Sequence, residues 1–267
     1  MGRSSVVLVT LLLAQACGQG ATPTTTTPAA LPPPADATTV APAPTTVPPV
    51  ETTEVSPTTT VAAVAQRDVT FVTSDDFTLE GTVFDGGPDW VILAHMFPST
   101  QTGWFGFARN AARDGFTALT FNFRGYGNSD GPKEPFRVDV DVVAAIDFAE
   151  SQGAQRVWLI GASMGGAGSL AAAPDRTSVV GVATLSAPTG WMGTDALGAV
   201  PQITVPKLFI AAEGDGGFAA SVSEFVAASA EPVDSKMFTG SRHGTELFAE
   251  HGEELTALLL DFLMSPR

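Results

Sequence analysis

Hydrophobic and polar positions change their period several times after residue 66, and each period predicts an element. Residues 69–86 alternate around a turn, which is typical of an antiparallel hairpin. The continuous apolar run 90–95 suits a strand covered on both faces. Further strands are predicted at 116–131, where the strand runs into a glycine-rich loop, and at 155–161, 179–188, 206–215 and 234–240. Helical spacing predicts helices over 106–115, 136–153, 165–174, 218–230 and 246–265.

Strands that alternate with helices in this way predict an α/β fold. We expect a mostly parallel, twisted sheet of about eight strands with helices on both faces. Functional sites in such sheets form where the carboxyl ends of the strands meet. The residues that directly follow a strand are therefore the first candidates for chemistry.

The first 66 residues lack this periodicity and predict two segments outside the domain at 67–267. Residues 1–17 combine Arg3, an apolar run over 6–14 and the sequence Ala-Gln-Ala-Cys, which predicts a secretory signal peptide. Its end fits either an ordinary signal-peptidase site or a lipoprotein box in which Cys17 is lipidated. Residues 18–66 contain ten of the 20 prolines and no aromatic residue, which predicts a disordered Thr/Pro/Ala-rich linker. We expect an exported protein, anchored at the cell surface through Cys17 or else secreted.

Composition narrows the partners of the predicted domain. The whole chain has a formal net charge of −15, and the predicted domain at 67–267 holds 25 of the acidic residues against 12 basic ones, which argues against nucleic acid or an anionic membrane surface as a partner. The three histidines are not at metal-ligand spacing, and the single cysteine belongs to the export signal. No phosphate-binding loop follows the first strand. We therefore expect no metal and no cofactor, and membrane contact only through a lipid anchor; the oligomeric state stays open.

A glycine-rich turn after the strand at 155–161 carries a candidate nucleophile. Residues 161–165 read Gly-Ala-Ser-Met-Gly and match the pattern G-x-S-x-G, which places a serine on a strained turn between strand and helix. Gly161 and Gly165 leave out side chains that would clash where strand and helix pack closely. The turn presents the Ser163 hydroxyl above the sheet. The N–H of Met164, at the helix start, faces the place where an oxyanion would form.

Two other strand ends supply a base and an acid. A serine hydroxyl is a weak nucleophile without a base, and His243 follows the last short strand. An imidazole base needs an acid to hold its tautomer, and Asp215 ends the segment 206–215. Glu213 is the nearest alternative acid. His251 lies inside the closing helix, where an exposed histidine is the simpler interpretation.

At this point the sequence resembles the α/β-hydrolase superfamily over residues 67–267. The resemblance rests on the segments GASMGG, AHMFPS, FNFRGYGNSDG, EGD and SRHG. The chain order Ser163, Asp215, His243 is the order found in this superfamily. The resemblance implies acyl transfer by a Ser–His–Asp triad, with no cofactor.

The resemblance also assigns roles to the loop after residues 90–95. Family members read His-Gly-x there, with x donating the second oxyanion N–H; x is Phe97 here, and Met96 replaces the glycine. His95 is then a loop-shaping residue. Arg124 would brace the loops around the site.

Only residues 189–205 separate the strand after the nucleophile from the acid strand, which is too short for a helical cap. An open site resembles compact esterases and members similar to dienelactone hydrolase. Trp104, Phe105 and Trp191 are candidates for lining a substrate pocket. We predict a serine hydrolase that cleaves small or medium carboxylic esters through an acyl-enzyme. Two alternatives stay open: an exopeptidase or amidase on the same fold, and a non-catalytic surface-anchored binding module.

Overall fold

The computed structural model describes residues 63–133 and 136–265. The predicted signal peptide with Cys17, and the predicted linker up to residue 62, lie outside these ranges. The first strand begins at Gln66, one residue before the predicted start of the domain. The predicted domain thus lies within the described ranges, apart from residues 134–135 and 266–267.

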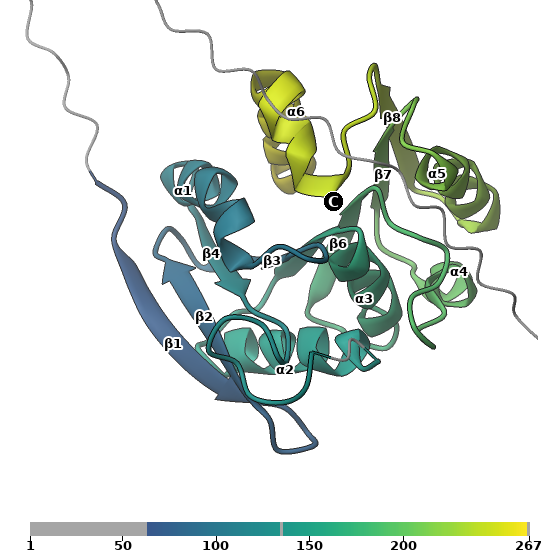
Figure 1. Cartoon of the computed structure of the whole chain (residues 1–267). Coiled ribbons are helices and arrows are strands. Elements are labelled where there is room, and N and C mark those ends of the chain that lie inside the picture. Colours follow the sequence, from purple (N-terminus) through teal and green to yellow (C-terminus); the bar gives the residue numbers. More distant parts are fainter. Residues whose placement is uncertain (1–62, 134–135, 266–267) are drawn as a thin grey trace, which may run out of the picture. The chain divides into compact units, whose positions relative to one another are not determined.

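The predicted sheet is confirmed, and its eight strands follow the order β1-β2-β4-β3-β5-β6-β7-β8 (Figure 1). Strand β2 runs antiparallel to both of its neighbours, whereas β3 to β8 pair in parallel. The bounds are β1 Gln66–Val72, β2 Thr78–Phe84, β3 Asp89–Ala94, β4 Phe116–Phe121, β5 Val157–Ala162, β6 Val179–Leu185, β7 Lys207–Ala212 and β8 Val233–Phe238.

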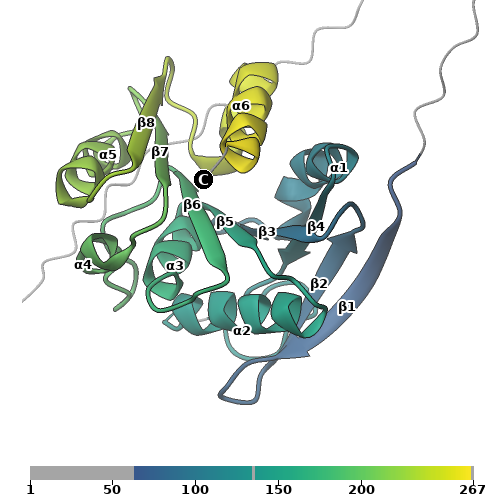
Figure 2. The same cartoon turned by 180° about the vertical axis from the view of Figure 1, so that it is seen from behind.

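Helices cover both faces of the sheet, because the central strands are apolar on both faces. Helices α1 (Phe105–Arg113) and α6 (Leu247–Met264) lie on one face (Figures 1 and 2). The other face carries α2 (Val138–Ser151), α3 (Met164–Ala172), α4 (Ala196–Ala199) and α5 (Gly217–Ala228). In β3, Ile92 packs toward the second group, and its neighbours Val91 and Leu93 pack toward the first.

Short elements that the sequence pattern did not predict complete the chain. They are α4 and three 3₁₀ turns, η1 Gln101–Trp104, η2 Val200–Gln202 and η3 Gly244–Glu246. Each has three or four residues, about one helical turn, so an amphipathic pattern has no length over which to repeat. Hydrophobic spacing therefore carries no signal for them.

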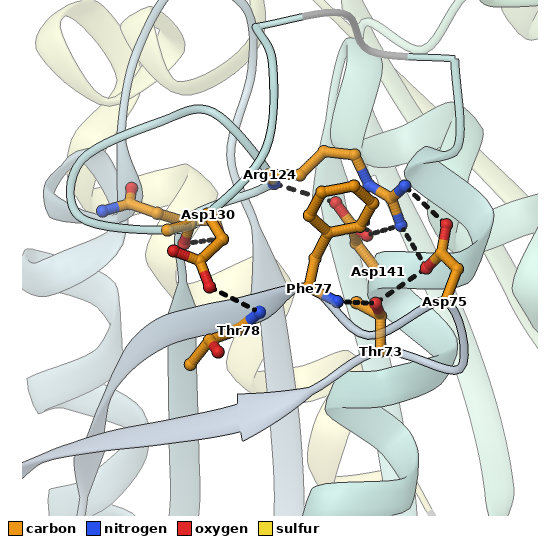
Figure 3. A network of polar contacts seen from close by, with 9 residues as sticks. Thr73, Asp75, Phe77, Thr78, Arg124, Asp130 and Asp141 are labelled. Carbon is orange, nitrogen blue, oxygen red and sulfur yellow. Dashed lines mark hydrogen bonds and ion pairs between the residues drawn. The ribbon is translucent and has the colours of Figure 1, made fainter.

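A partly buried ion-pair network fastens the loop after β4 (Figure 3). The Arg124 guanidinium bonds to Asp141 Oδ1 in the first turn of α2 at 2.6 Å, and to Asp75 Oδ2 in the β1–β2 turn at 2.8 Å. The Phe77 ring lies 4.7 Å from the guanidinium carbon. Hydrogen bonds from Arg124 hold the pKa of Asp75 well below its usual range. Arg124 thus joins three segments that are distant in sequence.

Candidate active site

Ser163 lies at the junction of β5 and α3, in a backbone conformation that serines rarely adopt. Its φ is 47° and its ψ is −115°. A side chain at Gly161 would place Cβ 2.2 Å from the Gly165 carbonyl oxygen, and one at Gly165 would place Cβ 2.3 Å from the Ala94 carbonyl oxygen. The turn is therefore possible only with glycine at both positions. The Ser163 N–H donates to the Leu185 carbonyl at 2.8 Å, which ties the turn to the end of β6.

The Ser163 hydroxyl is left without a hydrogen-bond partner among the residues that the structure describes. Within the described ranges it makes no hydrogen bond, and it is not among the enclosed polar atoms that lack a partner. The oxygen is therefore reached by solvent, although the residue as a whole is only 3% exposed. Directly after it, the N–H of Met164 belongs to the first turn of α3, where backbone donors have no partner within the helix.

His243 and Asp215 are brought together from two strand ends. The His243 Nδ1 atom lies 3.0 Å from both carboxylate oxygens of Asp215. Asp215 is buried after β7, and His243, after β8, keeps 24% of its side chain exposed. Donation from Nδ1 to the carboxylate leaves Nε2 as the acceptor, which is the tautomer that a general base needs. The alternative acid Glu213 is exposed to solvent.

The loop that carries His243 lies against the turn that carries Ser163. Gly244 has a φ of 55°, and a Cβ there would be 3.4 Å from the Ala162 Cβ and 2.7 Å from the Met96 Sδ. The residue after the predicted base thus lies near the residue before the predicted nucleophile, with little room for a side chain between them. No hydrogen bond joins Ser163 to His243 among the described residues. Such bonds are often long in free enzymes and tighten when substrate binds.

His95 shapes the loop after β3 and is fully buried. Its Nδ1 donates to the Met96 carbonyl at 2.9 Å, and its Nε2 accepts from the Phe123 N–H at 3.2 Å. Burial lowers the pKa of His95 to about 4, so the ring is neutral near pH 7. This neutral ring holds the backbone directly before Phe97, the predicted second oxyanion donor.

The structure separates the three predicted pocket residues. The Trp191 ring lies 6.1 Å from the half-exposed ring of Phe97, beside the loop after β3. Trp104 is fully buried, and its indole N–H donates to the Ala94 carbonyl at 3.0 Å. Phe105 packs edge-on against Phe84 of β2 at 5.3 Å. Trp191 is therefore brought to the candidate site, whereas Trp104 belongs to the core and Phe105 packs toward the other sheet edge.

Two contacts to the His243 loop were not found from the sequence. The Phe218 ring, at the start of α5, lies 4.3 Å from the imidazole. The Ser186 hydroxyl, directly after β6, accepts a hydrogen bond from the Gly244 N–H at 2.9 Å. The only sequence signal for either is its place at the end or start of an element near the carboxyl edge of the sheet.

Three other kinds of feature, a metal-ligand cluster, a membrane-spanning helix and a surface groove, add no residue to the candidate site within the described ranges. These residues hold no cluster of three or more potential metal ligands. None of their helices is long and apolar enough to cross a membrane. The groove between α1 and α6 has a volume of about 820 Å³, and its lining includes Phe107, Arg109 and Phe248 but none of Ser163, Asp215 and His243.

Comparison with known proteins places this geometry in a family. A family model described as the alpha/beta hydrolase fold matches residues 89–248, which include Ser163, Asp215 and His243. A Pyrococcus furiosus esterase structure has a TM-score of 0.65 and 17% identity, covering 75% of this chain and 90% of that chain. A dienelactone hydrolase structure from Anabaena variabilis has a TM-score of 0.65 and 19% identity, covering 76% of this chain and 98% of that chain.

A curated Escherichia coli protein described as an uncharacterized 31.7 kDa protein in the traX-finO intergenic region is 35% identical over 83 residues. That match covers 28% of this chain and 29% of that protein. The chain therefore matches less than a third of this relative's length. The family model, in contrast, covers more than half of the chain. On this evidence, the chain belongs to the alpha/beta hydrolase fold family.

Proposed function

We propose that this protein is a serine hydrolase that cleaves carboxylic esters of small or medium size through an acyl-enzyme. One observation carries the proposal: the His243 Nδ1 lies 3.0 Å from both Asp215 oxygens, and the next residue, Gly244, lies close enough to the serine turn that a Cβ there would be 3.4 Å from the Ala162 Cβ. A histidine held in this tautomer next to an unbonded serine hydroxyl is the arrangement that base-assisted nucleophilic attack requires.

The proposed reaction has two half-reactions. Ser163 Oγ attacks the ester carbonyl while His243 Nε2 takes its proton, and the tetrahedral oxyanion is held by the N–H groups of Met164 and Phe97. His243 then gives the proton to the leaving alkoxide, and the acyl-enzyme forms. Water next attacks the acyl carbon, again with His243 as the base. The carboxylic acid leaves as the proton returns to Ser163. Asp215 stays ionised throughout and stabilises the imidazolium.

The proposed substrate is a small-molecule ester with an apolar part. Phe97 and Trp191 place two aromatic rings beside the loop that would hold the oxyanion. Between β6 and β7 the chain forms only α4 and η2, so no helical cap covers the site in this segment. We further propose that the domain acts outside the cytoplasm, through export directed by residues 1–17, and is either anchored at Cys17 or released.

A fluorophosphonate probe tests the proposed nucleophile directly. We expect the full-length protein to be labelled, and Ser163→Ala to lose all labelling. Ser169→Ala provides a matched control, because Ser169 is a buried serine on the same helix whose hydroxyl has no partner in the described part. An unlabelled wild-type protein would refute the triad and favour the non-catalytic binding module.

A substrate comparison then tests the ester assignment. We expect hydrolysis of p-nitrophenyl acetate and no hydrolysis of an aminoacyl p-nitroanilide. Asp215→Asn should lower kcat by about 10³–10⁴, because the imidazole would lose the acceptor that sets its tautomer. A labelled enzyme that cleaves only the anilide would be an exopeptidase or amidase instead.

A further inference from the structure

Ser186 is strained and fully buried, yet the proposed mechanism gives it no role. It follows β6 directly, has a φ of 54° and is not exposed at all. Glycine and asparagine tolerate this left-handed region better than serine does, so serine here carries a conformational cost. Its N–H donates to the Ile210 carbonyl of β7 at 2.7 Å, which fixes the backbone in this conformation.

The hydroxyl of Ser186 reaches the loop that carries His243. Ser186 Oγ accepts from the Gly244 N–H at 2.9 Å, in a buried contact that spans 58 positions of the chain. The carbonyl of the preceding residue, Leu185, accepts from the Ser163 N–H at 2.8 Å. Two adjacent residues at the end of β6 are therefore bonded to the backbones of the proposed nucleophile and of the residue after the proposed base.

The surroundings make this hydrogen bond difficult to replace. A Cβ at Gly244 would lie 2.7 Å from the Met96 Sδ and 3.4 Å from the Ala162 Cβ, so the backbone here is closely surrounded and its N–H has little room to reach another partner. Without the Ser186 hydroxyl this N–H would lose its partner in a buried place, which favours displacement of the loop. Because His243 directly precedes Gly244, such a displacement changes the distance between the imidazole and Ser163.

We propose that Ser186 is a positioning residue that sets the separation of Ser163 and His243, a role that rests on the proposed function. Its hydroxyl holds the His243 loop against the end of β6, while Leu185 holds the Ser163 turn against the same strand end. The strained conformation of Ser186 is what aims the hydroxyl at Gly244. We attribute the strained backbone of Ser186 to this role in positioning the His243 loop.

Two substitutions separate this role from a purely structural one. Ser186→Ala keeps the strain and loses the hydroxyl, whereas Ser186→Gly relieves the strain and also loses the hydroxyl. We expect Ser186→Gly to have the higher melting temperature of the two. Both should nevertheless lower kcat for p-nitrophenyl acetate by about 10- to 100-fold with KM within about twofold, because both release the His243 loop. Ser169→Ala should keep the wild-type kcat.

A second measurement does not depend on hydrolysis. In wild-type protein and in Ser169→Ala, proton NMR should show a low-field Nδ1–H signal from the His243–Asp215 pair. In both Ser186 variants this signal should broaden or disappear, because a released loop exchanges the proton with water. Wild-type kcat and an intact signal in Ser186→Gly would overturn the proposal. If the wild-type protein is not labelled by fluorophosphonate, the esterase proposal fails, and the NMR comparison still decides whether Ser186 positions His243.

Discussion

The buried imidazole of His95 predicts how the stability of this domain depends on pH. Its two nitrogens bond to the Met96 carbonyl and to the Phe123 N–H, so a second proton on Nε2 would face a donor. The ring also packs edge-on against Phe123 and Tyr126, at 5.0 and 4.9 Å. The folded state therefore resists protonation, whereas the unfolded chain accepts the proton at the ordinary pKa of about 6.5.

The size of the effect follows from the two pKa values. Burial lowers the pKa of His95 to about 4 in the folded protein. Between pH 6.5 and 4 the unfolded state binds more protons, so the free energy of unfolding decreases as the pH falls, by about 1.4 kcal/mol per unit. The total is about 3 kcal/mol: the contribution is fully present above pH 6.5 and is lost as the pH falls through about 4.

Urea denaturation at pH 4, 5, 6 and 7 measures this contribution when the wild type is compared with His95→Gln. Glutamine can donate to Met96 and accept from Phe123, but it does not titrate. We expect the variant to be less stable at pH 7 through imperfect packing. Its stability between pH 6.5 and 4 should decrease by about 3 kcal/mol less than that of the wild type. Parallel pH profiles for the two proteins would refute the reasoning.

Two further predictions concern buried polar groups. Asp141→Asn removes a carboxylate that accepts three hydrogen bonds from Arg124 and leaves Asp75 as the guanidinium's remaining acidic partner. Urea denaturation at pH 7 should show a loss of about 3 kcal/mol, and a loss below about 1 kcal/mol would contradict the network's importance. Ser169→Ala removes a buried hydroxyl without a partner in the described ranges and improves helix propensity in α3. A gain of about 1 kcal/mol is expected, and destabilisation would mean that the hydroxyl holds a bound water.

The fold could be predicted because the hydrophobic period of each segment agrees with the element that it forms, and the order of these elements indicates the sheet. Strands with apolar or alternating residues left a periodic signal in the sequence. The alternation of strands with helices after β2 then restricts β3 to β8 to a parallel arrangement. The conformation at Ser163 was also predictable, because Gly161 and Gly165 are needed at fixed offsets. The pairing of His243 with Asp215 rests on the rule that strand ends meet. The action of these three residues as a triad stays a prediction.

The contacts that hold the site could not be predicted, because they join residues that no local pattern relates. Ser186 and Gly244 are 58 positions apart, and no sequence motif relates one to the other. Trp104 and Trp191 both follow strands after short loops and carry the same side chain. Only the tertiary structure shows that one donates to Ala94 in the core while the other faces Phe97. Aromatic composition alone does not separate a core residue from one that lies beside the candidate site.

The close contact of Gly165 with the end of β3 bears on how this protein can evolve. A Cβ at Gly165 would lie 2.3 Å from the Ala94 carbonyl oxygen and 2.7 Å from that of His95, so helix and loop meet backbone to backbone. Met164, at the start of α3, and Phe97, in the loop after β3, lie on the two sides of this junction. The position of each backbone N–H is set by the main chain and does not depend on which side chain the residue carries. Under the proposed function, mutation can alter the side chains of Phe97 and Trp191, and so the esters that the domain accepts, while the two backbone amides keep their positions.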